Sequence, residues 1–206
     1  MTDVYLASRS PRRRELLKQI GVKFEPLMLR LAAPRGADVD EVQHAGESAA
    51  DYVERVARAK AEIGAQALAL RSMLVKPVLT ADTVVIVDGD VLGKPANPQQ
   101  AADFLRRLSA RTHEVRTAVA VALGSGAKRR ILLATSVSQV TFGALSEAQI
   151  KQYCATGEPY DKAGGYAIQG LAAVFVARIE GSYSGVMGLP LYETAQLLRE
   201  AGVPVL

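Results

Sequence analysis

The sequence predicts an α/β fold with a mixed β-sheet, and three observations lead to this prediction. Short apolar strand-like segments and amphipathic helix-like segments alternate along the whole chain, which is the pattern of α/β architectures. An Asp-Gly pair inside one β-rich run indicates a hairpin. The 206 residues are 49% hydrophobic and 22% charged, which is enough for one large domain or two small lobes with a proper core.

Composition argues against several classes of protein. No apolar run approaches the ~18–20 residues that cross a bilayer, and the first residues enter a strand-like run without a signal-peptide pattern, so we expect a cytoplasmic protein without membrane contact. The single cysteine, Cys154, excludes an internal disulfide, and only two histidines accompany it. A structural zinc site is therefore not expected, and any metal should be a hard ion on oxygen ligands.

The charge is mildly basic, with a formal net charge of +4 and a pI of about 9.3. The dense basic runs at residues 12–14 and 128–130 contain no interleaved aromatic residues, which single-stranded nucleic acids use for stacking. The second run follows a Gly-Ser-Gly segment, so we interpret it as a solvated hairpin tip. We expect no nucleic-acid partner.

The first elements are a strand over residues 4–7, a short loop and a helix that ends before Gly21. Ser10 suits the N-cap and Pro11 the first helical position. Free backbone N–H groups and the positive end of the helix dipole then lie beside Arg12 and Arg13, an arrangement that suits a phosphate group. The alternative is an ordinary charged helix start at the surface, where these arginines oppose the dipole.

Residues 23–46 are predicted to be irregular, and they contain an acidic patch at residues 38–41 whose carboxylates either reach a metal or are solvated. A long helix follows from Ser48, with Asp51 completing a variant of the capping box. Its apolar residues include Tyr52, and Lys60 falls within the apolar stripe of positions 53, 56, 63 and 67. Lys60 either reaches solvent from the edge of the stripe or directs its ammonium into a site.

The β-rich run at residues 79–95 is the most informative stretch. A two-residue turn at Asp88-Gly89 pairs Thr83 with Lys94, which would place Asp82 near that lysine at the mouth of a hairpin. The interpretation stays open between an exposed salt bridge and a functional site at a strand end.

The second half of the chain continues the alternation. We expect helices from Asn97-Pro98 and from the Ser146–Gln149 capping box, strands at 118–123, 131–142 and 172–177, and a last helix at 192–200. His113 is interpreted as a hydrogen-bonded structural residue. Residues 158–170 concentrate ionisable and amide groups beside glycines, so they form either a binding loop or a Gly-rich connection.

Taken in order, these motifs resemble the Maf family, the nucleoside triphosphate pyrophosphatases first tied to bacterial septum formation. The resemblance rests on Ser8-Arg9-Ser10-Pro11-Arg12-Arg13, Ala81-Asp82-Thr83, Gly93-Lys94-Pro95, Asp161-Lys162-Ala163-Gly164, Ile168-Gln169-Gly170 and Gly188-Leu189-Pro190. Each motif alone is weak, whereas the ordered set is specific and spans almost the whole chain. Two positions depart from the usual pattern, since Gly165 stands where the family often has alanine and Ala167 where it often has glycine.

The resemblance implies an elongated, twisted mixed sheet flanked by helices, an ITPase-like fold, with residues 1–206 forming a single domain of two lobes and a cleft between them. It implies hydrolysis of the α–β phosphoanhydride bond of nucleoside triphosphates to a monophosphate and pyrophosphate. The motifs are similar to the branch that acts on dTTP and UTP, and modified pyrimidine nucleotides are further candidates. A homodimer is plausible by the same similarity.

The resemblance also assigns site residues. Asp82 matches the expected proton acceptor, and Arg12, Thr83 and Gln169 match the specificity positions. Further substrate-binding positions match Ser8, Arg13, Lys60, Lys94, Asp161 and Lys162. The metal-associated acid matches Glu41, which with Asp82 would hold Mg²⁺ or Mn²⁺. Asp82 acts either as the general base or mainly by orienting a metal-bound hydroxide.

Two other functions compete with this hypothesis. A nucleotide-binding regulator of cell division would keep the basic groups and need no catalytic acid, and it would leave UTP intact. A DNA-binding protein is suggested only by the pI and would bind DNA with a steep salt dependence.

Overall fold

The computed structural model describes residues 3–29 and 39–205. The strands are β1 (Val4–Leu6), β2 (Phe24–Pro26), β3 (Val78–Val87), β4 (Asp90–Leu92), β5 (Thr112–Leu123), β6 (Arg130–Phe142) and β7 (Val176–Glu180). The α-helices are α1 (Pro11–Gln19), α2 (Ala49–Leu70), α3 (Pro98–Leu108), α4 (Glu147–Cys154), α5 (Tyr183–Met187) and α6 (Leu191–Glu200). No helix in the described ranges is both long enough and apolar enough to cross a membrane.

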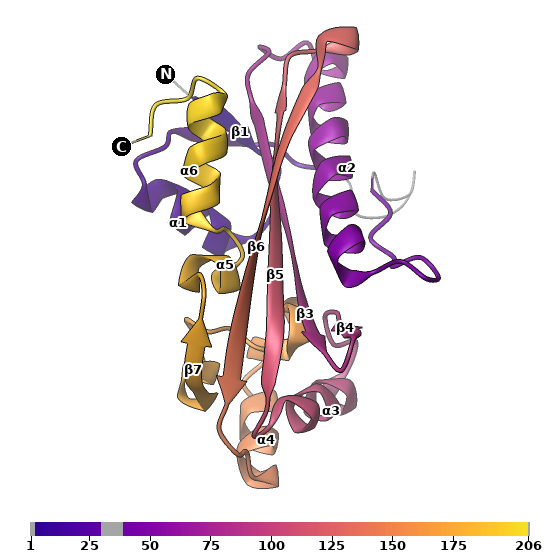
Figure 1. Cartoon of the computed structure of the whole chain (residues 1–206), viewed down its shortest axis with the longest axis vertical. Coiled ribbons are helices and arrows are strands. Elements are labelled where there is room, and N and C mark those ends of the chain that lie inside the picture. The colour runs from indigo at the N-terminus through magenta and orange to yellow at the C-terminus, as the bar shows by residue number, and fades with distance from the viewer. Residues whose placement is uncertain (1–2, 30–38, 206) are drawn as a thin grey trace. The chain divides into compact units, whose positions relative to one another are not determined.

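The sheet is mixed, as the sequence predicts. Within the described residues it has seven strands in the order β2-β1-β3-β5-β6-β7, with β4 paired to β3 (Figure 1). Strand β1 runs parallel to β2 and to β3, whereas β3 with β4 and β6 with β7 are antiparallel. The mixed α/β fold class is therefore confirmed.

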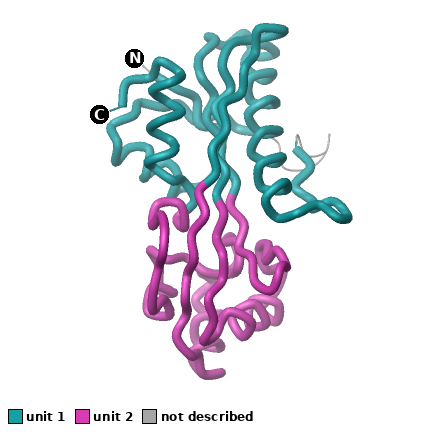
Figure 2. Tube along the Cα trace, in the orientation of Figure 1, with its two compact units in different colours: residues 1–82, 117–135, 188–206 teal, residues 83–116, 136–187 magenta. Residues whose placement is uncertain are grey.

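The chain divides into two compact units (Figure 2). Unit 1 contains residues 1–82, 117–135 and 188–206, and unit 2 contains residues 83–116 and 136–187. Strands β3, β5 and β6 each contribute residues to both units. The predicted organisation, a single domain over residues 1–206 with two lobes, stays a prediction.

Unit 1 is built on the first parallel strands and α2. Leu6 of β1, Leu17 of α1, Val53 and Val56 of α2 and Leu79 of β3 are all fully or almost fully buried. Ser10 caps α1 by accepting from the backbone N–H of Arg13, with Pro11 at the first helical position. Ser48 caps α2 in the same way through the N–H of Asp51. Both predicted N-caps are confirmed.

Unit 2 has its own apolar core, formed by α3, α4 and the sheet. Leu105, Leu108, Phe142 and Ile150 are buried in it. His113 is also buried, with its Nε2 2.8 Å from the hydroxyl of Tyr166, which confirms it as a hydrogen-bonded structural residue. The Ser146–Gln149 capping box begins α4 as predicted.

The hairpin of β3 and β4 has the predicted register. Val85 pairs with Leu92 and Val87 with Asp90, and both turn residues have positive φ, 55° at Asp88 and 84° at Gly89. This is the backbone of a primed two-residue turn, which matches the twist of the strands. The paired residues end at Leu92, so the pairing of Thr83 with Lys94 lies beyond the observed ladder.

Two secondary-structure predictions are wrong. The strand predicted at 172–177 is wrong over residues 172–175, because Leu171–Phe175 is a short 3-10 helix and the strand, β7, begins only at Val176. The irregular stretch at 23–46 contains β2, whose three residues are too few to show an alternating pattern. Parallel pairing with β1 supplies its partner.

Candidate active site

Two carboxylates and one ammonium form the centre of the candidate site, and all three belong to unit 1. The Nζ of Lys60 lies 2.7 Å from Oδ1 of Asp82 and 3.1 Å from Oε1 of Glu41. Asp82 comes from β3, Lys60 from α2, and Glu41 from the segment 39–47 that precedes α2. Residues that are 19 and 22 positions from Lys60 in sequence thus meet at one nitrogen.

The environment of Lys60 decides between its two interpretations. Its side chain is only 13% exposed, and that of Asp82 is 14% exposed. A lysine that reaches solvent from the edge of an apolar stripe would expose its ammonium, whereas this ammonium contacts two acids. The ammonium of Lys60 is therefore directed toward two acids and not toward solvent, and its role in a functional site stays a prediction.

Arg13 is anchored beside this centre by groups of the same unit. Its Nε donates to the carbonyl oxygen of Gly188 at 2.7 Å, and its Nη1 donates to the hydroxyl of Ser8 at 3.3 Å. The same hydroxyl accepts from the backbone N–H of Ser10 at 3.2 Å. Ser8, which is buried, therefore links the loop before α1 to the guanidinium of Arg13.

The charges of both acids affect the pKa of Arg13. Burial lowers the pKa of Arg13 from its usual value, the charge of Asp82 raises it, that of Arg12 lowers it, and that of Glu41 raises it. Arginine stays protonated throughout the physiological range, so the site keeps a fixed positive charge near its two carboxylates. The predicted phosphate site at the start of α1 thus has the basic groups it needs, and binding of an anion there stays a prediction.

A pair of carboxylates sharing one cation fits a divalent metal. Mg²⁺ is often held by one or two carboxylates together with water and substrate phosphates, and Asp82 and Glu41 supply two hard oxygen donors within 3.1 Å of the same nitrogen. The described residues contain no group of three or more His, Cys, Asp or Glu side chains arranged to hold a metal.

The predicted site residues of unit 2 have different surroundings. Thr83 is half-buried, and Lys94 and Gln169 are exposed. Asp82 forms its ion pair with Lys60, which replaces the predicted salt bridge with Lys94 as the structural explanation of this acid. The functional roles of Thr83, Lys94 and Gln169 stay predictions.

The loop at 158–170 is closed by Glu158. Its carboxylate accepts from the hydroxyl of Tyr153 at 2.9 Å and from the backbone N–H groups of Leu171 at 2.9 Å and Ala172 at 3.3 Å. Lys162 pairs with Asp161 and donates to the carbonyl oxygen of Glu158 at 2.7 Å. Hydrogen bonds to Glu158 thus connect the two ends of this loop.

Sequence reasoning missed two residues that hold Glu41. Tyr52, which we counted with the apolar residues of α2, donates its hydroxyl to the carbonyl oxygen of Glu41 at 2.8 Å. Arg55 donates to the carbonyl oxygens of Asp40 and Val42 at 3.1 and 2.8 Å. The only available signal was their spacing of three residues at the start of a helix that follows an acidic loop.

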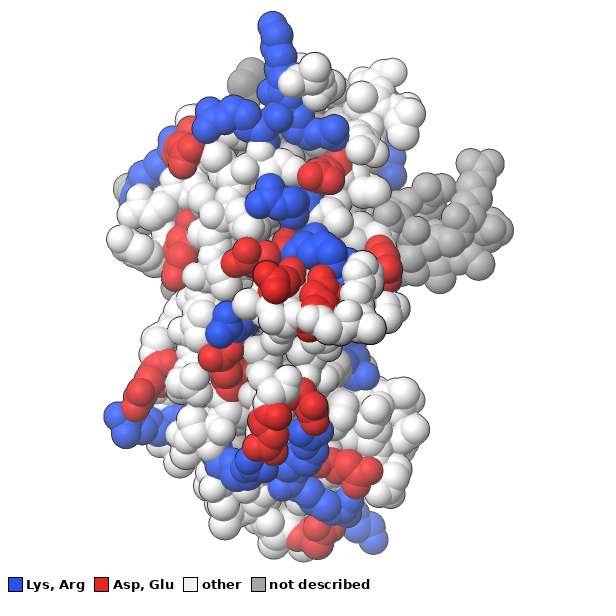
Figure 3. All heavy atoms as spheres, turned by 45° about the vertical axis from the view of Figure 1, so that its right-hand side comes forward, with Lys and Arg blue, Asp and Glu red and all other residues white. Residues whose placement is uncertain are grey.

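Charges outside this centre are mixed. In the view of Figure 3 acidic and basic side chains are interspersed over much of the face shown. The basic run at 128–130 lies at the turn between β5 and β6, where Lys128 and Arg130 are exposed, as expected of a hairpin tip. Arg129 donates to the carbonyl oxygen of Glu62 at 3.2 Å, and Arg130 pairs with Glu200 at 3.3 Å.

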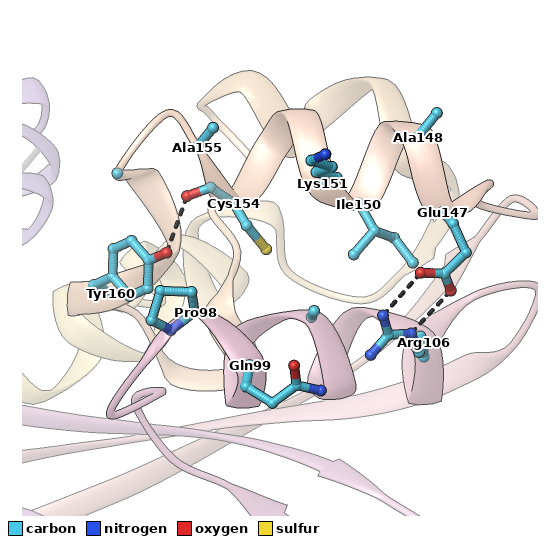
Figure 4. Close-up of a pocket in the computed structure, with 12 residues that line it drawn as sticks. Pro98, Gln99, Arg106, Glu147, Ala148, Ile150, Lys151, Cys154, Ala155 and Tyr160 are labelled. Carbon is cyan, nitrogen blue, oxygen red and sulfur yellow. Dashed lines mark hydrogen bonds and ion pairs between the residues drawn. The ribbon is translucent and has the colours of Figure 1, made fainter.

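Unit 2 also has a pocket of about 770 Å³ between α3 and α4 (Figure 4). Its lining includes Gln99, Ile150 and Lys151, and the ion pair of Arg106 with Glu147 at 2.8 Å joins α3 to α4 at one side of it. None of the site residues predicted from the sequence lines this pocket. Its geometry therefore does not bear on the candidate active site.

Comparisons with known proteins match this chain to a family model and to similar proteins. The family model described as "Maf-like protein" matches residues 3–201. A "dTTP/UTP pyrophosphatase" of Nitrosospira multiformis is 55% identical over 202 residues, covering 98% of this chain and 96% of that protein. The protein of the same name from Nitrosomonas europaea is 50% identical with the same coverage.

Among solved structures, the Ham1 protein of Staphylococcus aureus is similar with a TM-score of 0.44 and 17% identity, covering 68% of this chain and 71% of that one. The family match extends over nearly all of the sequence and includes every residue of the candidate site. The chain belongs to the Maf family.

Proposed function

We propose that this protein is a hydrolase that cleaves the α–β phosphoanhydride bond of nucleoside triphosphates, with dTTP and UTP as substrates, and releases the nucleoside monophosphate and pyrophosphate. The observation that carries this proposal is the similarity, at 50–55% identity over almost the full length, to proteins named dTTP/UTP pyrophosphatase. The geometry of unit 1 supports it, because acids and fixed cations are gathered at one place.

The positive groups suit a triphosphate. Attack of water on a phosphorus atom surrounded by anionic oxygens requires charge neutralisation and positioning more than covalent catalysis. Arg13, fixed by Ser8 and the carbonyl of Gly188, supplies a constant charge. Lys60 supplies a second charge and at the same time fixes the carboxylate of Asp82. Arg12, at the start of α1, is the third basic group on this side.

Asp82 is the residue to which we assign the activation of water. Its carboxylate is largely buried and held by one ammonium, which orients it. It would accept a proton from the attacking water or orient that water for attack. Asp82 and Glu41 would hold Mg²⁺ or Mn²⁺, and such an ion neutralises charge on phosphate oxygens when it is bound.

Selection of the base is assigned to Arg12, Thr83 and Gln169 by the family motifs, and substrate contacts to Lys94, Asp161 and Lys162. The closed loop at 158–170 supports this assignment, since its ends are tied and its exposed Gln169 is free to meet a ligand from solvent. Modified pyrimidine nucleotides are further candidate substrates.

The reaction is tested with a panel of nucleoside triphosphates that contains dTTP, UTP, CTP, modified pyrimidines and 7-methyl-GTP, with pyrophosphate and phosphate measured separately. We expect pyrophosphate from dTTP and UTP. Phosphate as the first product, or intact UTP after prolonged incubation with Mn²⁺ despite measurable binding, would contradict the proposal and favour a nucleotide-binding regulator.

The role of Asp82 is tested by Asp82→Asn. The amide has the same shape but cannot take up the proton or the full negative charge, so pyrophosphate release should fall by about 10²–10⁴-fold, the usual contribution of a general base. Asp90→Asn is the matched control, because Asp90 is an exposed acid that pairs with Arg107 at 2.8 Å. Near-normal turnover of Asp82→Asn, with the fold intact by circular dichroism, would refute the assignment.

A further inference from the structure

Glu41 lies in a segment that has no helix or strand to orient it. Residues 39–47 contain only bends and turns, and the side chain of Glu41 is 41% exposed. Its ion pair with Lys60 at 3.1 Å is the contact that links its carboxylate to Asp82. A half-exposed side chain on an irregular loop would lose this position readily unless its backbone were held.

The backbone of this segment is held by two side chains of α2. The carbonyl oxygens of three consecutive residues, 40, 41 and 42, accept hydrogen bonds of 3.1, 2.8 and 2.8 Å from Arg55, Tyr52 and Arg55 again. Tyr52 and Arg55 are three positions apart, so they project from the same face of the helix. The guanidinium carbon of Arg55 also lies 5.6 Å from the centroid of the Tyr52 ring.

Arg55 is itself fixed by Glu47. The carboxylate of Glu47 accepts from Nε of Arg55 at 2.6 Å and from its Nη2 at 3.0 Å, a two-bond geometry that orients the planar guanidinium. Glu47 also accepts from the backbone N–H of His44 at 3.0 Å. The guanidinium therefore joins both ends of the segment 40–47 to the first turns of α2.

Tyr52 and Lys60 hold Glu41 at two different points. The hydroxyl of Tyr52 donates to the backbone carbonyl oxygen of Glu41 at 2.8 Å. The same helix supplies Lys60, which contacts the carboxylate of Glu41. Helix α2 thus holds the backbone of Glu41 through Tyr52 and the side chain of Glu41 through Lys60.

From these contacts we propose that Tyr52 and Arg55 are positioning residues that hold Glu41 beside Asp82, so that both carboxylates can bind one divalent cation. The proposal rests on the proposed function, which supplies the cation and the substrate. Tyr52 and Arg55 reach the reaction only through Glu41. Their loss should weaken metal binding while leaving turnover at saturating metal largely intact.

The experiment compares Tyr52→Phe, Arg55→Met and the wild-type protein. Binding of Mn²⁺ is measured by electron paramagnetic resonance in the presence of a UTP analogue with an imido bridge between the α and β phosphates. The Mn²⁺ dependence of pyrophosphate release from UTP is measured separately. We expect the dissociation constant and the half-saturating concentration of Mn²⁺ to rise about tenfold, as for other residues that orient metal ligands.

Two controls separate positioning from general structure. Arg71→Met removes an arginine that donates to another loop carbonyl, that of Met28 at 3.0 Å, from the end of the same helix, and it should leave Mn²⁺ binding unchanged. In a Glu41→Gln background, Tyr52→Phe should have no further effect on Mn²⁺ binding, because coupled residues are not additive. Arg55→Lys should not restore binding, since an ammonium lacks the planar fork of donors.

The outcomes are distinguishable. Unchanged Mn²⁺ binding in Tyr52→Phe and Arg55→Met, or an equal loss with and without Glu41→Gln, would overturn the positioning proposal. If Arg55→Met does not fold, Tyr52→Phe decides the matter, because it keeps the ring and removes one hydroxyl. Absence of pyrophosphate from the wild-type protein would instead overturn the proposed function, whereas the resonance measurement would still report on Tyr52 and Arg55.

Discussion

The ammonium of Lys60 separates two like charges, which gives this residue a structural task as well as a proposed catalytic one. Asp82 and Glu41 both lie within 3.1 Å of its nitrogen. Lys60→Met should lower the free energy of unfolding by about 1–3 kcal/mol, because a largely buried carboxylate loses its partner. Urea denaturation measures this change.

A divalent ion should compensate for the missing ammonium, so Mn²⁺ should stabilise Lys60→Met more than it stabilises the wild-type protein. Lys151→Met, at an exposed position of α4, is the control and should unfold like the wild type. A Lys60→Met variant as stable as the wild type would show that the two carboxylates do not depend on this lysine.

His113 makes the stability of the protein depend on pH. Burial lowers its pKa from 6.5 to about 4, and the neutral ring stays in a core where its Nδ1 has no hydrogen-bond partner. In the unfolded chain His113 binds a proton near pH 6.5, whereas in the folded protein it does so only near pH 4. The contribution of this residue is complete above pH 6.5 and is lost as the pH falls towards 4, by about 3 kcal/mol at most.

Urea unfolding at pH 7.5, 5.5 and 4.5 measures this effect. The loss of stability on acidification should be smaller in His113→Gln, which has no titrating ring, than in the wild-type protein. Parallel curves for wild type and His113→Gln would contradict the prediction.

At the scale of elements, Glu158 is the residue that closes the loop carrying Asp161, Lys162 and Gln169. Its carboxylate accepts three hydrogen bonds, two of them from backbone N–H groups at the far end of the loop. Glu158→Gln replaces one acceptor oxygen by a donor and leaves at least one of these groups without a partner. We expect a loss of about 1–3 kcal/mol in unfolding free energy.

The matched control is Glu147→Gln in the same unit. Glu147 is 70% exposed and pairs with Arg106 at 2.8 Å, and exposed pairs contribute only about 0–1 kcal/mol. Thermal unfolding and the rate of proteolysis within residues 159–170 compare the two variants. Equal losses would show that Glu158 is no more than a surface acid.

The elements that were predictable from the sequence are those encoded by neighbouring residues. The caps at Ser10, Ser48 and Ser146 and the turn at Asp88-Gly89 depend on local chemistry, and all are confirmed. Strand β2 was missed because its strand character comes from pairing with β1. The apolar run at 172–177 was assigned as a strand because its composition does not distinguish a strand from the short helix Leu171–Phe175.

For the whole molecule, the candidate site was predictable in part. Lys60 was marked by its position within an apolar stripe, and Asp82 by its place on a strand before a turn. Glu41 was one of the acids at 38–41 whose role the pattern left open, and only the family resemblance singled it out. The roles of Tyr52 and Arg55 were not predictable. They bind backbone carbonyls, and because every residue has one, the sequence does not indicate which of them accept. The homodimer, the preferred metal and the cytoplasmic location stay predictions.

The hydrogen bond from Arg13 to the carbonyl of Gly188 joins residues 175 positions apart. Unit 1 is likewise assembled from three separate segments, the last of which begins at residue 188. During synthesis, the ribosome must therefore release most of the chain before Arg13 can find its partner. The contact that fixes Arg13 can therefore form only after residue 188 has left the ribosome, so the candidate active site cannot be completed while the chain is shorter than this.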